Sequence, residues 1–66
     1  MLCVVNGQSM ELPDSTTVAE LIARLGLSDA ICAAEVDREL VPKRSRAERV
    51  LREGERVEVV TLVGGG

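Results

Sequence analysis

The sequence predicts a small α+β domain with five β-strands and one α-helix, and three observations support this. Residues 1–5 are continuously apolar and reach Asn6-Gly7, a dipeptide favoured where both central positions of a hairpin turn need positive φ. A helix-capping signal begins at Thr17 and is followed by apolar residues at helical spacing. Residues 56–62 read as a last strand that runs directly into three glycines.

The first two strands are expected to form a hairpin around Asn6-Gly7, with residues 1–5 before the turn and an extended pattern over residues 8–12 after it. An unbroken apolar run is typical of a central strand that is covered along most of its length. Such a run has no alternation from which to read the buried face. We expect Cys3 and Val5 to point into the core.

The helix is expected to begin at Val18, because Thr17 and Glu20 have the spacing of a capping box. Its apolar residues fall on a single stripe at i, i+3, i+4 and i+7, namely Val18, Leu21, Ile22 and Leu25. Gly26 stands where a left-handed residue ends a helix, and Leu27 can fold back on the last turn. The sequence therefore predicts one amphipathic helix of about two turns.

Two short strands are expected after the helix. Residues 31–36 alternate so that one set faces inward, comprising Cys32, Ala34 and Val36. Asp37-Arg38 is suited to a tight turn into a fourth strand over residues 39–41, which Pro42 ends.

The remaining residues lead to the last strand. Residues 43–52 are polar with scattered apolar positions, which indicates a loop with a short helical turn. In the final strand, residues 56–62, we expect Val57 and Val59 to face the helix. Val60 and Leu62 then face outward, either as ordinary exposed apolar residues or as part of a docking surface.

Composition excludes several classes of function. With 66 residues and no Phe, Tyr or Trp, the core is thin and leaves little room for an enclosed substrate cavity. The net charge of −3 opposes phosphate neutralisation, and base stacking lacks aromatic side chains, so nucleic acid is not an expected partner. No apolar run is long enough to cross a membrane, and no export signal is recognisable. We expect a monomeric protein of the reducing cytoplasm.

Two cysteines, Cys3 and Cys32, are the remaining reactive side chains. They are isolated in the sequence, and no histidine is present to complete a metal site or to activate a thiolate. We expect both cysteines to be reduced and to be small buried residues. We also expect neither to have a basic neighbour that would generate a thiolate. A disulfide between them is the alternative. No metal site is expected.

The segment that carries chemistry is the C-terminus, where Val63 is followed by Gly64, Gly65 and Gly66. Glycines lose the most backbone entropy on ordering, so we expect residues 63–66 to form a flexible tail. Four residues beyond Leu62 extend by about 13 Å, enough for the terminal carboxylate to enter a partner's active-site channel. Terminal glycines are also common as frayed ends without function.

A carboxylate is a poor electrophile, so acyl chemistry at Gly66 requires activation. The simplest route is attack of the carboxylate on the α-phosphate of ATP, which gives an acyl-adenylate. The metal and phosphate binding for that step must belong to a partner enzyme. The absence of side chains in Gly64 and Gly65 would let the tail thread a narrow channel that excludes most other C-termini.

Five segments, in this order and spacing, carry a resemblance to a known family: Asn6-Gly7, TVAEL at 17–21, LVPKR at 40–44, GERVEVV at 54–60 and VGGG at 63–66. The whole chain is similar to the ThiS-type sulfur carriers of bacterial thiamine biosynthesis, which are ubiquitin-like proteins of the β-grasp fold. Asp37 departs from the relatives, which often carry Asn in that turn, and Asp suits the turn equally well.

The resemblance implies a β-grasp domain over residues 1–62, with a mixed sheet of strand order 2-1-5-3-4 on one helix. It also implies a reaction cycle. A ThiF-type adenylyltransferase, related to ubiquitin-activating enzymes, uses MgATP to adenylate Gly66. Sulfur from a donor such as a cysteine desulfurase displaces AMP to give a thiocarboxylate, which a ThiG-type thiazole synthase receives. Gly64 and Gly65 thread the partner's active site, and Val60, Leu62 and Val63 are candidates for docking.

The resemblance makes this chain a carrier and not an enzyme, with no cofactor of its own. Three alternatives remain open at this point. Carriers of molybdopterin or cysteine biosynthesis share the fold and a Gly-Gly end. A ubiquitin-like modifier would use the same adenylation and become linked to target lysines. A plain interaction domain would carry an inert tail.

Overall fold

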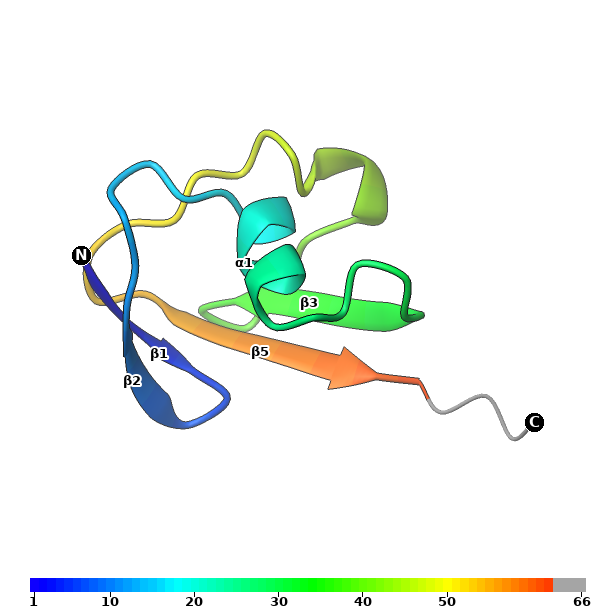
Figure 1. The fold of residues 1–66 in the computed structure, drawn as a ribbon, viewed down its shortest axis with the longest axis horizontal. Coiled ribbons are helices and arrows are strands. Elements are labelled where there is room, and N and C mark those ends of the chain that lie inside the picture. The colour runs from blue at the N-terminus through cyan, green and yellow to red at the C-terminus, as the bar shows by residue number, and fades with distance from the viewer. Residues whose placement is uncertain (63–66) are drawn as a thin grey trace.

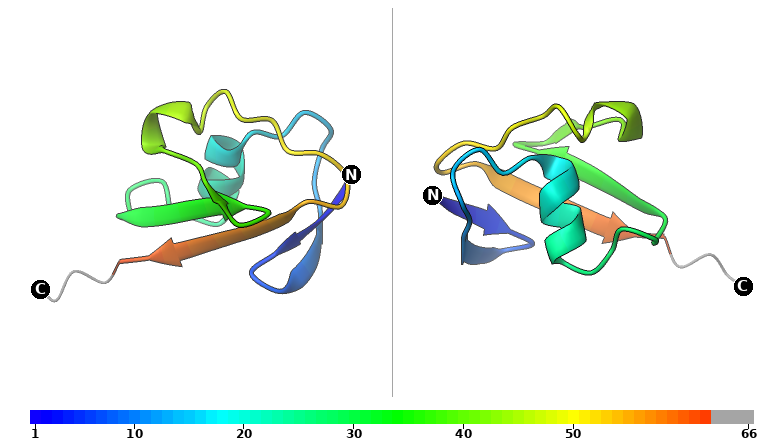
Figure 2. Two further views of the ribbon diagram at one scale, coloured as in Figure 1. Left: turned by 180° about the vertical axis from the view of Figure 1, so that it is seen from behind. Right: turned by 45° about the horizontal axis from the view of Figure 1, so that its top comes forward.

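A computed structural model describes residues 1–62, and the predicted tail, residues 63–66, lies outside the described residues. Five strands form one sheet in the order β2-β1-β5-β3-β4, and one helix lies across one face of it (Figures 1 and 2). The predicted strand order is confirmed. The elements are β1 Leu2–Val5, β2 Gln8–Glu11, α1 Val18–Arg24, β3 Cys32–Val36, β4 Glu39–Leu40, the 3₁₀-helix η1 Lys43–Ser45 and β5 Arg56–Thr61.

The β1–β2 hairpin forms as the turn dipeptide predicts. Asn6 has φ 49° and Gly7 has φ 82°, the left-handed conformation that a two-residue hairpin turn requires at both positions. Antiparallel pairing runs from Val5 opposite Gln8 to Leu2 opposite Glu11. The prediction for the buried face is also confirmed, because the Cys3 and Val5 side chains are buried.

β5 lies at the centre of the sheet. It pairs in parallel with β1, where Val5 is opposite Val57, and antiparallel with β3, from Val36 opposite Val57 to Cys32 opposite Thr61. β5, the last strand of the described residues, is therefore paired with β1 on one side and β3 on the other at Val57. Regular pairing ends at Thr61, one residue earlier than predicted, although Leu62 still makes one strand-like hydrogen bond.

Both ends of α1 are capped as predicted. The Glu20 backbone N–H donates to Thr17 Oγ1 at 3.1 Å, and Glu20 Oε1 accepts from the Thr17 N–H at 2.8 Å. At the other end, Gly26 has φ 77°, and the Leu27 N–H donates to the Ile22 carbonyl oxygen at 3.0 Å. This is the Schellman arrangement, which satisfies the last carbonyl groups of a short helix.

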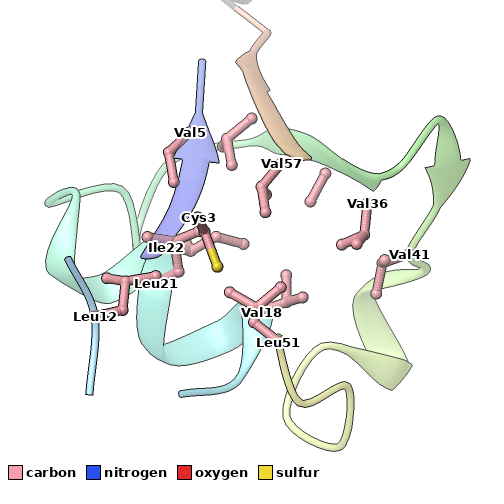
Figure 3. Close-up of a cluster of buried hydrophobic side chains, with 12 residues drawn as sticks. Cys3, Val5, Leu12, Val18, Leu21, Ile22, Val36, Val41, Leu51 and Val57 are labelled. Carbon is pink, nitrogen blue, oxygen red and sulfur yellow. The ribbon is translucent and has the colours of Figure 1, made fainter. Parts of the chain in front are cut away.

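The core fills the space between the helix and the inner face of the sheet (Figure 3). It consists of twelve buried apolar side chains: Cys3, Val5, Leu12, Val18, Leu21, Ile22, Ala34, Val36, Val41, Leu51, Val57 and Val59. The predicted inward sets of β3 and β5 supply four of these. Leu51 comes from irregular chain and is 2% exposed. Burying one such leucine side chain contributes roughly 1.5–3 kcal/mol, so Leu51 fastens its loop to the domain.

The long loop after η1 is tied to the start of the helix. The Leu51 N–H donates to the Thr16 carbonyl oxygen at 2.8 Å, and the Val18 N–H donates to the Arg49 carbonyl oxygen at 2.9 Å. Arg49 Nη2 also lies 2.8 Å from Glu55 Oε2. The prediction of a loop with a short helical turn is confirmed, and Arg49 of this loop is ion-paired.

Candidate functional site

The end of β5 is the described structure nearest to the predicted working group. β1 turns away after Val5 and Val57 have paired, whereas β5 continues to Thr61 (Figure 1). The described chain ends one residue later at Leu62, and we call this point the exit. The Leu62 N–H donates to the Ile31 carbonyl oxygen at 2.8 Å, which keeps this last residue beside the start of β3. Backbone hydrogen bonding thus holds the end of the described chain on its β3 side.

Exposed apolar side chains gather around this exit. Val60 and Leu62 are 56% and 58% exposed, as predicted for the outward set. Ile31 is 71% exposed, the highest value among the large apolar residues of the described chain, and Ala33 pairs with Val60. Side chains alternate along a strand, so Val60 and the half-buried Ala33 lie on the face of the sheet away from the helix. The Leu62–Ile31 hydrogen bond continues the β3–β5 register by one residue, which places these two residues next to Val60 and Ala33. We call Ile31, Ala33, Val60 and Leu62 the terminal apolar patch.

Ile31 is a candidate that the sequence reasoning missed. The sequence pattern places it only at the beginning of the third strand. The available signal was its parity, which is opposite to that of the inward Cys32 and Ala34. Its proximity to Leu62 depends on the pairing of β3 with β5, which no local pattern contains.

Two acidic side chains stand beside the patch on the same face. Glu35 of β3 is directly opposite Glu58 of β5. Like charges in this arrangement repel, so the pair weakens the sheet slightly. Within residues 1–62, neither carboxylate has an ion-pair partner. The outer face therefore offers an apolar patch bordered by unneutralised negative charge.

The two cysteines have different surroundings. Cys3 is fully buried, its thiol lies 3.3 Å from the Arg52 carbonyl oxygen, and burial followed by the negative charge of Glu55 raises its pKa. Cys3 is therefore a core side chain, as predicted, and a poor nucleophile. Both cysteines are free.

The expectation that neither cysteine has a basic neighbour is wrong for Cys32. Arg46 Nη1 lies 3.8 Å from Cys32 Sγ, and Arg46 Nη2 donates to the Cys32 carbonyl oxygen at 2.6 Å. The expectation considered neighbours in the sequence, whereas Arg46 arrives from the loop after η1. Cys32 is also only partly buried.

The part of the chain that the structure describes, residues 1–62, contains no group of three or more His, Cys, Asp or Glu side chains placed to hold a metal ion. None of its helices is both long enough and apolar enough to cross a membrane. The predicted site residues Val63, Gly64, Gly65 and Gly66 lie outside the described residues.

Comparison with known proteins identifies the family. The model of the ThiS family matches residues 3–66, which is nearly the whole chain and includes the three terminal glycines. The chain belongs to the ThiS family. A sulfur carrier protein ThiS from Escherichia coli is 26% identical over 66 residues, and the alignment covers 100% of both chains. The predicted assignment to the ThiS-type sulfur carriers of thiamine biosynthesis is confirmed at the level of the family.

A solved ThiS structure supports the same conclusion. The crystal structure of thiamine biosynthesis protein ThiS from Geobacter metallireducens superimposes with a TM-score of 0.84 at 26% identity, covering 100% of each chain. Together with the strand order and the single helix, this confirms the predicted β-grasp fold.

One relative is a much longer protein than this chain. A thiazole synthase from Paramagnetospirillum magneticum is 36% identical over 66 residues, which are 100% of this chain and 20% of that protein. The chain thus spans about a fifth of this relative and the full length of the ThiS relatives.

Proposed function

We propose that this chain carries sulfur for the thiazole ring of thiamine as a thiocarboxylate on Gly66. The observation that carries the proposal is the family match, which extends through the terminal glycines. The geometry of β5 supports it, because the central strand of the five-stranded sheet directly precedes the tail in the sequence. A carrier needs such an anchor, since a partner must find the reacting carboxylate at a defined distance from the surface that it binds.

The reaction would proceed in two stages. An oxygen of the Gly66 carboxylate attacks the α-phosphorus of ATP, the bond to pyrophosphate breaks, and an acyl-adenylate forms. A sulfur nucleophile then attacks the acyl carbon, a C–S bond forms, and the C–O bond to AMP breaks. If the nucleophile is a persulfide, the product is an acyl disulfide, and a thiol reductant supplies the two electrons that release the thiocarboxylate.

The chain would supply position and not catalysis. Gly64 and Gly65 thread the partner's active site, because their bare backbone passes where side chains would collide. The terminal apolar patch, together with Val63, docks on the partner. Glu35 and Glu58 favour a partner surface with basic side chains beside an apolar area.

Three partners follow from this chemistry. A ThiF-type adenylyltransferase binds MgATP and catalyses the activation, and a donor such as a cysteine desulfurase supplies the sulfur. A ThiG-type thiazole synthase receives it, which agrees with the similarity of the whole chain to part of a thiazole synthase. We place the cycle in the cytoplasm, with this chain acting as a monomer when free.

Mass spectrometry of the protein isolated from its host tests the proposal. A carrier is expected to include a species in which one oxygen of Gly66 is replaced by sulfur, with the change localised by fragmentation. Recovery mainly as conjugates to lysines of other proteins would instead identify a modifier. An unaltered terminus in cells that are actively making thiamine would reject both functions.

A further inference from the structure

The two sides of β5 are supported differently near its end. On the β3 side, backbone pairing continues to Cys32 opposite Thr61, and the Leu62 N–H reaches Ile31. On the β1 side, the paired residues end with Val5 opposite Val57. The Asn6 N–H then donates to the Val57 carbonyl oxygen at 2.9 Å, and the chain turns away into the hairpin.

Beyond Val57, the side chain of Asn6 supplies a hydrogen bond to β5 that the backbone of β1 no longer provides. Asn6 Oδ1 accepts a hydrogen bond from the Val59 N–H at 2.8 Å, in a partly buried position. A β1 strand that continued straight would present a backbone carbonyl to this amide. The side-chain amide takes its place, so the hydrogen bonding along this edge of β5 extends two residues further towards the exit.

Asparagine is suited to this double task. Asn6 has φ 49°, and Asn is among the few non-glycine residues that adopt this conformation readily. Glycine would satisfy the turn but would offer no acceptor to Val59. Aspartate would satisfy both requirements, since its short side chain also tolerates the left-handed region and its carboxylate accepts hydrogen bonds.

We propose that Asn6 is a positioning residue for the working end of the chain. By clamping the Val59 amide, it fixes the course of β5 between the central pairing and the exit at Leu62. Val60, the next residue, belongs to the terminal apolar patch, so the clamp also fixes the patch relative to the rest of the sheet. The role in docking rests on the proposed carrier function, whereas the hydrogen bond from the Val59 N–H to Asn6 does not.

The competing interpretation is that Asn6 serves only the hairpin turn and overall stability. Three variants of the full-length chain separate the two. Asn6→Gly keeps the turn and removes the acceptor. Asn6→Asp keeps both the turn and the hydrogen-bond acceptor for Val59. Thr17→Ala removes the N-cap of α1, on the opposite side of the sheet from the patch, and serves as a control for general loss of stability.

The first measurement is amide hydrogen exchange. In Asn6→Gly, the Val59 amide should exchange on the order of tenfold faster, over and above any change at the core amide of Leu21. In Asn6→Asp, Val59 should exchange as in the wild type. If Val59 and Leu21 change by the same factor in Asn6→Gly, Asn6 gives the Val59 amide no specific protection and the proposal is overturned.

The second measurement is ATP–pyrophosphate exchange with the adenylyltransferase of the same host. Asn6→Gly should raise the KM for this chain several-fold with kcat unchanged, because docking suffers while the terminus is intact. Asn6→Asp should restore the KM. A KM no higher than that of Thr17→Ala would overturn the positioning role even if Val59 is released. A wild-type chain that supports no exchange would reject the carrier function, and Val59 exchange would still decide the clamp.

Discussion

Leu62 donates its backbone N–H to the carbonyl oxygen of Ile31 at 2.8 Å, and this bond brings together two exposed apolar side chains from distant parts of the chain. Ile31 follows the loop after α1, whereas Leu62 is the last described residue. Because Ala33 pairs with Val60 in the same register, these two residues and the Ile31–Leu62 pair together form the terminal apolar patch beside the exit. The first prediction concerns this patch.

Replacing Ile31 or Val60 with Asp should weaken docking on the activating enzyme. Each apolar side chain that is desolvated at an interface centre contributes roughly 1–2 kcal/mol, so the KM in ATP–pyrophosphate exchange should rise about 5- to 30-fold. Stability should change by no more than about 0.5 kcal/mol for Ile31→Asp, since the side chain is exposed. Thermal melts check that the variants fold.

Leu40 provides a matched control for the patch. It is 65% exposed and lies on the same face, but it pairs with Glu35 at the other end of β3 from Ile31. Leu40→Asp should leave the KM near the wild-type value. An equal rise in KM for Leu40→Asp and Ile31→Asp would mean that docking has no preference for the exit, and the patch would lose its assignment.

A second prediction concerns the opposed carboxylates of Glu35 and Glu58. Glu35→Gln should stabilise the fold by a few tenths of a kcal/mol at low salt, because it removes a like-charge contact across the sheet. The gain should vanish at about 1 M salt, where the screening length is about 3 Å. Urea denaturation at the two salt concentrations measures this. A gain that is unchanged by salt would assign the effect to packing.

Local features of this fold could be predicted from the sequence because their causes are local. The Asn6-Gly7 turn needs positive φ twice, and the capping box of Thr17 spans one helical turn. The outward direction of Val60 follows from alternation within β5. The strand order came from the family resemblance, since periodicity does not say which strands are neighbours.

The features that escaped prediction are contacts between segments. The bond from Val59 to Asn6 joins residues 53 positions apart, and Arg46 reaches Cys32 from a loop without periodicity. The opposition of Glu35 to Glu58 depends on the β3–β5 register, and a shift by one residue would place each side chain opposite a different neighbour. Charge and alternation identify such residues without saying what they meet.

A third prediction concerns alkaline pH and the Met1 ammonium. This group donates to the Leu12 carbonyl oxygen at 2.7 Å and lies 3.3 Å from Glu11 Oε2. Burial lowers the pKa of the ammonium, but hydrogen bonds and charges from Glu11 and Asp14 outweigh it and raise the pKa above its ordinary 8.0. A raised pKa in the folded state stabilises the fold fully below pH 8.0, and the contribution is lost as pH rises through the folded pKa.

Urea midpoints measured from neutral to alkaline pH test this for the chain with a free Met1 ammonium. The midpoint should fall above pH 8.0. The Cys3 thiol, whose pKa is also raised by burial, gives a fall of the same sign. An N-terminally acetylated chain retains Cys3 and lacks the ammonium, so it should show a smaller fall. Identical pH profiles for the two chains would contradict the prediction.

A fourth prediction is that Cys32 is dispensable for sulfur carriage despite its contact with Arg46. Cys32→Ala removes the thiol but keeps the backbone carbonyl to which Arg46 Nη2 donates. The variant should fold and should acquire the thiocarboxylate at Gly66 as the wild type does. Mass spectrometry after incubation with the activating enzyme, MgATP and a sulfur donor measures this. Normal adenylation without thiocarboxylate would place Cys32 in the sulfur transfer.

The last prediction concerns the terminus itself. Deleting Gly66 should abolish adenylation, because one residue contributes about 3.3 Å of reach and the shortened carboxylate would not meet the α-phosphate. Gly65→Val should have the same effect by adding bulk where the partner's channel admits only backbone. Both variants should melt like the wild type, since a glycine supplies no side chain to the core that residues 1–62 form. ATP–pyrophosphate exchange and a thermal melt of each variant measure the two properties together. Exchange at the wild-type rate after deletion of Gly66 would mean that the terminal carboxylate is not the working group, and the carrier mechanism would have to be abandoned.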